Sequence, residues 1–360
     1  MTSSPFFTLR PPIMLMGMLS LVAGLIAGLQ RLGVNVPLGV GNLAEYHGPL
    51  MICGFLGTVI GLERAVALGR LYPYAAPALT GAGSLLLVFG VSDEGGKILL
   101  ASGSLILAAV FISILRIQIA MATALMGLGA GMWAVGNILW LSGWAIPDVT
   151  PWWAAFLVLT IAGERLELSR LLQLGRGANA AFLLAVGVFV SGVTLTVVAQ
   201  IAGLKLMGLG MIGLALWLGT HDIARHTIKM TGLTRFVAAC LLSGYVWLGV
   251  SGVMTFFVDG LGSGPMYDAM LHSLFLGFVF AMIFGHAPII FPAVLEVAVP
   301  YTPAFYAHLV VLEISLLARV GSDLGGFSKA LTHAGALNEA ALILFLLNTI
   351  VAVVRGKLGR

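Results

Sequence analysis

The stretch KILLASGSLILAAVFISIL at residues 97–115 begins with a lysine and then carries no further charge. A helix of about 20 apolar residues crosses the hydrocarbon core of a bilayer, so this stretch predicts a transmembrane span. Similar stretches recur along the chain and predict spans at residues 12–31, 46–68, 73–91, 97–115, 119–143, 151–173, 178–201, 204–220, 232–257, 267–295, 302–320 and 333–354. The sequence therefore predicts an all-α polytopic bundle of about twelve transmembrane helices, forming a single transmembrane domain over residues 1–360.

The composition agrees with this fold class. Hydrophobic residues make up 60% of the 360 residues and charged residues only 9%, whereas a soluble domain keeps a charged exterior. The chain has 47 glycines, as expected where membrane helices pack closely through small residues. No block of basic residues stands out. We therefore expect the lipid bilayer, and no nucleic acid, as a partner.

The distribution of positive charge predicts the orientation. Of the 18 lysines and arginines, only five fall on one predicted side, namely Arg31, Lys97, Lys205, Arg319 and Lys329. The remaining 13 lie on the side of the N-terminus. Because cytoplasmic loops are enriched in Lys and Arg, both termini are predicted to be cytoplasmic. The compartment that fits is a bacterial inner membrane.

Two histidines lie at similar predicted depths, towards the outer face. His47 opens the second predicted span and His272 lies early in the tenth. Two imidazoles that face each other can ligate a haem iron axially, but intramembrane histidines also serve as polar packing groups or substrate sites. Along the helix face from His47, Met51 and Gly54 are followed by the mostly small residues Thr58, Gly61 and Ala65. That face admits either a flat macrocycle or a neighbouring helix.

A second, deeper layer of ionisable residues lies towards the cytoplasm. It comprises Glu63, Arg64, Glu164, Arg165, His286 and His308. Imidazole and carboxylate groups suit copper, iron or zinc, so a second metal site that includes His286 and His308 is one interpretation. A proton relay through Glu63, Arg64, Glu164 and Arg165 is another, and Glu–Arg pairs at the helix ends are a third. Three similar segments lie four predicted spans apart, which suggests three similar four-helix units: Gly61-Leu62-Glu63-Arg64, Gly163-Glu164-Arg165 and Gly285-His286.

The segment Tyr46-His47-Gly48-Pro49-Leu50-Met51 resembles the His-Gly-x-x-Met segment that opens helix 2 of haem–copper oxidase subunit I. In that family this histidine ligates the low-spin haem, and its partner comes from helix 10, where this chain has His272. The family also has twelve helices, cytoplasmic termini and a pseudo-threefold arrangement of four-helix units. The resemblance implies bis-histidine ligation of a haem b by His47 and His272.

The chain is also similar to the NnrS family, small haem- and copper-containing membrane proteins linked to nitric oxide tolerance. Both matching segments are short: the first holds His47, Met51, Gly54 and Phe55, and the second holds His272, Gly277 and Gly285-His286. In the first segment, Pro49 stands where the family has a second histidine. The resemblance implies haem b, copper or another second metal, and a small diatomic ligand such as nitric oxide.

Several functional alternatives remain at this point. The seventh predicted span has no histidine, so a terminal oxidase is not expected. A haem-dependent oxidoreductase acting on nitric oxide, a membrane electron carrier, and a non-catalytic partner in a homo-oligomer or a respiratory complex all fit. The alternative from another class is a proton-coupled secondary transporter with an intramembrane Glu/His site.

Overall fold

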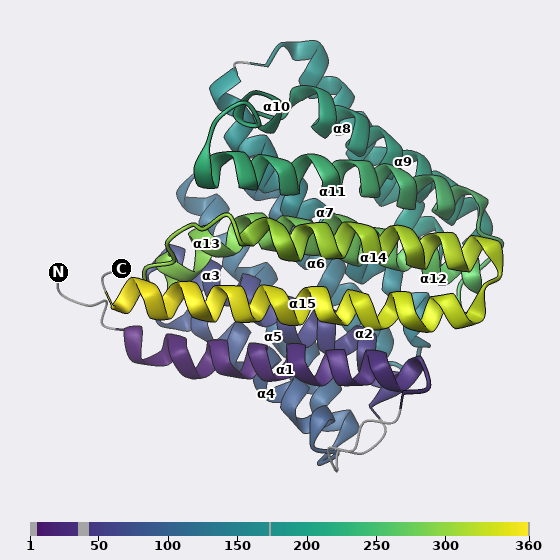
Figure 1. Cartoon of the computed structure of the whole chain (residues 1–360), viewed down its shortest axis with the longest axis horizontal. Coiled ribbons are helices and arrows are strands. Elements are labelled where there is room, and N and C mark those ends of the chain that lie inside the picture. The colour runs from purple at the N-terminus through teal and green to yellow at the C-terminus, as the bar shows by residue number, and fades with distance from the viewer. Residues whose placement is uncertain (1–5, 35–42, 173, 359–360) are drawn as a thin grey trace. The chain divides into compact units, whose positions relative to one another are not determined.

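The computed structural model describes residues 6–34, 43–172 and 174–358 (Figure 1). Within these ranges the chain forms helices and connecting segments, without a β-strand. Eleven of the described helices are long and apolar enough to cross a membrane. Their outward faces carry large apolar side chains such as Leu184, which is 69% exposed. The chain is therefore an all-α, integral membrane protein, as predicted.

The helices follow the predicted spans closely. The first part of the chain forms α1 (Arg10–Arg31), α2 (His47–Pro49), η3 (Leu50–Leu56), α3 (Gly57–Leu68), α4 (Ala75–Val88), α5 (Asp93–Ile117), α6 (Met121–Leu141) and α7 (Ile146–Ser169). The second part forms α8 (Arg176–Leu195), α9 (Gln200–His221), α10 (Ala224–Thr227), α11 (Gly232–Phe257), α12 (Pro265–His272), η6 (Ser273–Phe280), α13 (Ala281–Leu295), α14 (Phe305–Gly325) and α15 (Ser328–Lys357). The segments α2–η3–α3 and α12–η6–α13 are each one continuous span.

The predicted span at 73–91 accounts for the difference between about twelve helices and eleven. It contains α4, which has only 14 residues and follows a 3-10 turn at Tyr72–Tyr74. A helix of this length covers roughly 21 Å, less than the ~30 Å of a hydrocarbon core. The segment is helical as predicted, but it is shorter than the other spans.

The chain divides into two compact units. One comprises Met1–Phe156 and Ala293–Glu296, and the other comprises Leu157–Pro292 and Val297–Arg360. In the first unit, α1 packs against η3 and α4, and α5 packs between α4 and α6. In the second, α9 packs against α8 and α11, and α14 packs against α12 and α15, which runs beside it in Figure 1. Two compact units can belong to one domain, so the single domain stays a prediction. The three four-helix repeats also stay a prediction.

Close packing in both units depends on small residues. Gly208 of α9 lies so near α11 that a methyl group on it would be 2.5 Å from the Gly252 carbonyl oxygen. In the first unit, Trp133 stacks on Phe156 with ring centroids 4.6 Å apart. Both cysteines, Cys53 and Cys240, are buried free thiols. The close approach of Gly208 confirms that glycine supports helix packing, and the burial of both thiols makes the cysteines core residues.

Candidate functional site

His47 is fixed by a backbone contact in the first unit. It opens α2, and its Nδ1 lies 2.8 Å from the carbonyl oxygen of Gly24 on α1. A carbonyl oxygen can only accept a hydrogen bond, so Nδ1 carries the hydrogen. In a neutral imidazole, Nε2 then holds the lone pair. This is the tautomer in which histidine ligates a metal through Nε2.

The small-residue face beyond His47 is covered by neighbouring helices. Met51 is buried against α1, where a methyl group on Gly24 would lie 2.5 Å from the Met51 sulfur. A methyl group on Gly54 would lie 2.8 Å from Cβ of Ser84 and 3.0 Å from Cβ of Ser20. Of the two explanations for small residues at these positions, the contacts of Gly54 support helix packing.

His272 occupies a comparable place in the second unit. It ends α12, and its Nδ1 lies 2.8 Å from the carbonyl oxygen of Asp268, one turn earlier. The carboxylate of Asp268 is also close, with Oδ1 3.3 Å from the same nitrogen. Nδ1 is thus again the donor, and Nε2 again holds the lone pair in the neutral ring.

A π-helix follows each of these two histidines. Segment η3 (Leu50–Leu56) begins three residues after His47, and η6 (Ser273–Phe280) begins directly after His272. Among the described residues these are the two π-helical segments. Such segments are rare and frequently occur at functional sites. Sequence reasoning did not find them, because hydropathy does not report the local helix register.

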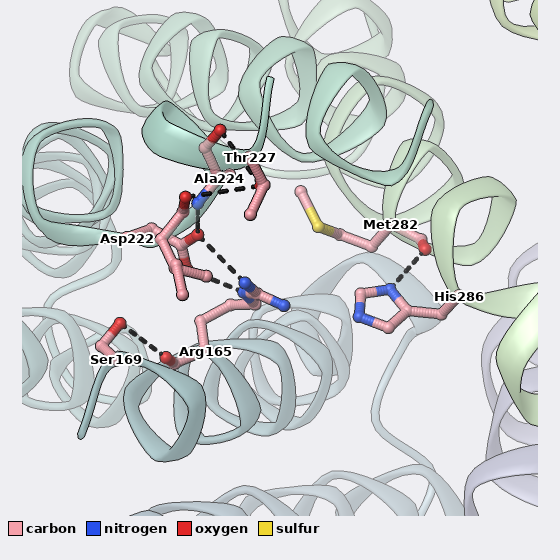
Figure 2. Close-up of polar contacts among 8 residues, drawn as sticks. Arg165, Ser169, Asp222, Ala224, Thr227, Met282 and His286 are labelled. Atoms are coloured by element: carbon pink, nitrogen blue, oxygen red, sulfur yellow. Dashed lines mark hydrogen bonds and ion pairs between the residues drawn. The ribbon is translucent and has the colours of Figure 1, made fainter. Parts of the chain in front are cut away.

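Arg165 and His286, both predicted for the deeper layer, lie in the second unit (Figure 2). Arg165 donates from Nε and from a terminal guanidinium nitrogen to the two carboxylate oxygens of Asp222, at 2.8 and 3.0 Å. Both side chains are almost fully buried, and Asp222 also accepts from the backbone nitrogen of Ala224 at 2.6 Å. In the view of Figure 2, the His286 ring lies on the side of the Arg165 guanidinium opposite Asp222. Its Nδ1 is 2.7 Å from the Met282 carbonyl oxygen.

The other members of the deeper layer are placed differently. Arg64 pairs with its neighbour Glu63 at 2.6 Å on α3, and Glu164 is half-buried beside Arg165 on α7. His308 on α14 is buried among phenylalanine rings, with the ring of Phe284 at 4.6 Å.

The tautomer of His308 differs from that of His47 and His272. The Asn348 amide nitrogen lies 3.1 Å from His308 Nδ1 and 3.2 Å from the Ala304 carbonyl oxygen, which can only accept. The amide nitrogen is therefore a donor to both, and in a neutral ring the hydrogen of His308 is on Nε2. Among the described residues this Nε2 is buried without a hydrogen-bond partner. His308 thus presents a hydrogen rather than a lone pair at Nε2.

In the described part of the chain, no three His, Cys, Asp or Glu side chains gather as a metal ion would require. That criterion does not apply to a haem held by two histidines. His47 and His272 belong to different compact units. The second metal near His286 and His308 stays a prediction.

The sequence did not reveal the burial or the partners of several polar residues. In the sequence Asp222 lies among the polar residues His221, Arg225 and His226, yet its side chain is fully buried against Arg165. Arg319 on α14 binds the Asp268 carboxylate through two bonds of 2.9 and 3.1 Å, although 51 residues separate them. The i,i+4 spacing of Asp268 and His272 was a readable signal.

Other intramembrane polar residues join neighbouring helices. The indole nitrogen of Trp247 donates to Glu313 at 2.7 Å, joining α11 to α14. Asn338 on α15 donates to Ser315 on α14 at 2.7 Å. Polar side chains thus hydrogen-bond α11 to α14 and α14 to α15, as membrane helices commonly do.

A search of curated proteins found no match. A family model described as Domain of unknown function (DUF8744) matches residues 10–354, nearly the whole chain. The protein with these two histidine–π-helix segments therefore belongs to the DUF8744 family.

Proposed function

We propose that this protein binds haem b in a bacterial inner membrane, where His47 and His272 would hold the haem iron, and that both termini lie in the cytoplasm. Its role would be the handling of nitric oxide or electron transfer within the membrane, as in the NnrS family that its motifs resemble. The observation that carries the proposal is the shared environment of the two histidines. Each has Nδ1 held by a backbone carbonyl, and each is followed by a π-helix.

The donor set suits a haem. Metal-ligating histidines almost always donate their other ring N–H to a carbonyl, a carboxylate or water, which fixes the tautomer and the ring orientation. The Gly24 carbonyl does this for His47, and Asp268 does it for His272. Haem would supply one-electron chemistry and binding of diatomic ligands, while the protein would supply ligands and burial. The missing oxidase histidines argue against a terminal oxidase.

The test is a visible spectrum of the protein purified from haem-replete cells, oxidised and then reduced with dithionite. We expect a Soret band with sharp reduced α and β bands, typical of a six-coordinate haem. His47→Ala and His272→Ala should each disrupt this spectrum, whereas His226→Ala, at an exposed position on α10, should not. A colourless wild-type protein with normal helical circular dichroism would refute the proposal. If the protein contains haem, titration with nitric oxide or carbon monoxide would show whether a coordination position of the iron opens.

A second candidate is a proton-coupled secondary transporter. It is favoured by buried carboxyl oxygens that lack hydrogen-bond partners among the described residues, on Asp323 and Glu339. Ionisable groups inside a membrane commonly mark proton pathways. Reconstituted liposomes with an internal pH dye test this candidate. It predicts substrate-dependent proton flux that Glu339→Gln abolishes, and a haem-free protein without such flux would exclude both candidates.

A further inference from the structure

His272 lies at the end of a chain of charged contacts within the second unit. Its Nδ1 is 3.3 Å from Oδ1 of Asp268, in addition to the 2.8 Å contact with the Asp268 carbonyl oxygen. The Asp268 carboxylate is held in turn by Arg319, which binds both of its oxygens. Arg319 is largely buried, with 9% of its side chain exposed.

A carboxylate behind a ligating imidazole changes that ligand. It fixes the ring orientation and raises the basicity of the metal-binding nitrogen, which favours the more positively charged metal. A guanidinium that binds both carboxylate oxygens fixes the carboxylate geometrically and balances its negative charge. The two residues therefore act on the imidazole in opposite electrostatic directions while holding it in one orientation.

We propose that Asp268 and Arg319 are positioning residues for His272 that set the reduction potential of the haem and help to retain it. This inference rests on the proposed function. The competing explanation is that the Asp268–Arg319 pair only joins α12 to α14. The two explanations differ in what they predict for the haem, because a structural pair would change protein stability and leave the potential unchanged.

The expected shifts have opposite signs. Asp268→Asn removes the negative charge behind His272, so the oxidised iron loses stabilisation and the midpoint potential rises. Arg319→Gln removes the balancing positive charge, so the carboxylate acts more strongly and the midpoint potential falls. Haem retention should weaken about 10- to 100-fold in Asp268→Asn, as is usual when an outer partner of a metal ligand is lost.

The experiment is redox potentiometry of the purified, full-length, haem-loaded protein, with haem dissociation to apomyoglobin as a second readout. Glu313→Gln is the matched control, because Glu313 is a partly buried carboxyl group on the same helix that bonds Trp247 instead of Asp268. Its midpoint potential should stay near the wild-type value. Where Arg319→Gln does not fold, Arg319→Lys keeps the charge and loses the two-bond geometry, so low-temperature EPR should show an altered haem signal.

Opposite shifts in Asp268→Asn and Arg319→Gln support the inference. Potentials and EPR signals that equal those of the wild type in all the folded variants overturn it, while the proposed function stands. A wild-type protein without haem refutes the proposed function itself. The two failures are thus distinguishable in one series of preparations.

Discussion

The buried ion pair of Arg165 and Asp222 leads to a prediction about stability. Only 3% of the Arg165 side chain and none of the Asp222 side chain is exposed, and two charge-assisted hydrogen bonds join them. Asp222→Asn keeps an oxygen that can accept from Ala224, but its amide nitrogen faces the guanidinium and the positive charge loses its partner. Removing one partner of a buried pair costs about 3–5 kcal/mol. We expect a loss of that size in the free energy of unfolding.

The double variant Arg165→Met/Asp222→Asn should be no less stable than Asp222→Asn alone. It removes the unpaired charge, and replacing a whole buried pair is often neutral or stabilising. The assay is reversible unfolding in mixed detergent micelles with increasing SDS, followed by circular dichroism, and arranged as a double-mutant cycle.

The chain offers a matched control on the surface. The Arg170–Glu167 pair has a similar 2.9 Å contact, but both side chains are about half exposed. Glu167→Gln should therefore cost no more than about 1 kcal/mol. If Asp222→Asn costs as little as this control, or if the double variant is simply the sum of the single ones, the energetic role given to the buried pair is wrong.

Two further predictions concern packing and capping in the first unit. Gly57→Ala should destabilise the protein by about 1–3 kcal/mol in the same unfolding assay, because the added methyl group would overlap the Trp133 ring. Gly131→Ala is the control and should be tolerated, because no atom lies near its new methyl group. Ser92→Ala should lower the free energy of unfolding by about 1 kcal/mol, since the Ser92 hydroxyl accepts a hydrogen bond from the Gly95 nitrogen at 3.0 Å and caps α5. An unchanged unfolding midpoint in Gly57→Ala or in Ser92→Ala would contradict the packing or the capping role given to that residue.

The fold was largely predictable because it depends on the hydropathy of consecutive residues along the chain. An apolar run long enough to cross a bilayer must satisfy its backbone hydrogen bonds internally, so it forms a helix whatever its neighbours are. The predicted run at 97–115 accordingly lies within α5. The π-helices after His47 and His272 could not be predicted in this way, because local register depends on side-chain packing between helices.

The candidate site was predictable only at residues whose burial in a membrane costs free energy. A histidine or arginine inside an apolar run needs a reason, and this drew attention to His47, His272 and Arg165. The partners of these residues were harder to find. Asp222 lies among polar residues that look solvated, and Arg319 lies far from Asp268 along the chain. Only the folded structure brings such residues together.

The two π-helices also bear on how relatives of this protein should be compared. A π-helix closes its hydrogen bonds over one residue more than an α-helix does, so it accommodates a single-residue insertion inside a span. Deleting one residue from Leu50–Leu56 or Ser273–Phe280 would let an α-helix form and would rotate the preceding histidine by about 100° relative to the rest of the span. Alignment gaps inside these two spans would then mark relatives whose histidines face elsewhere, even where every aligned residue is identical.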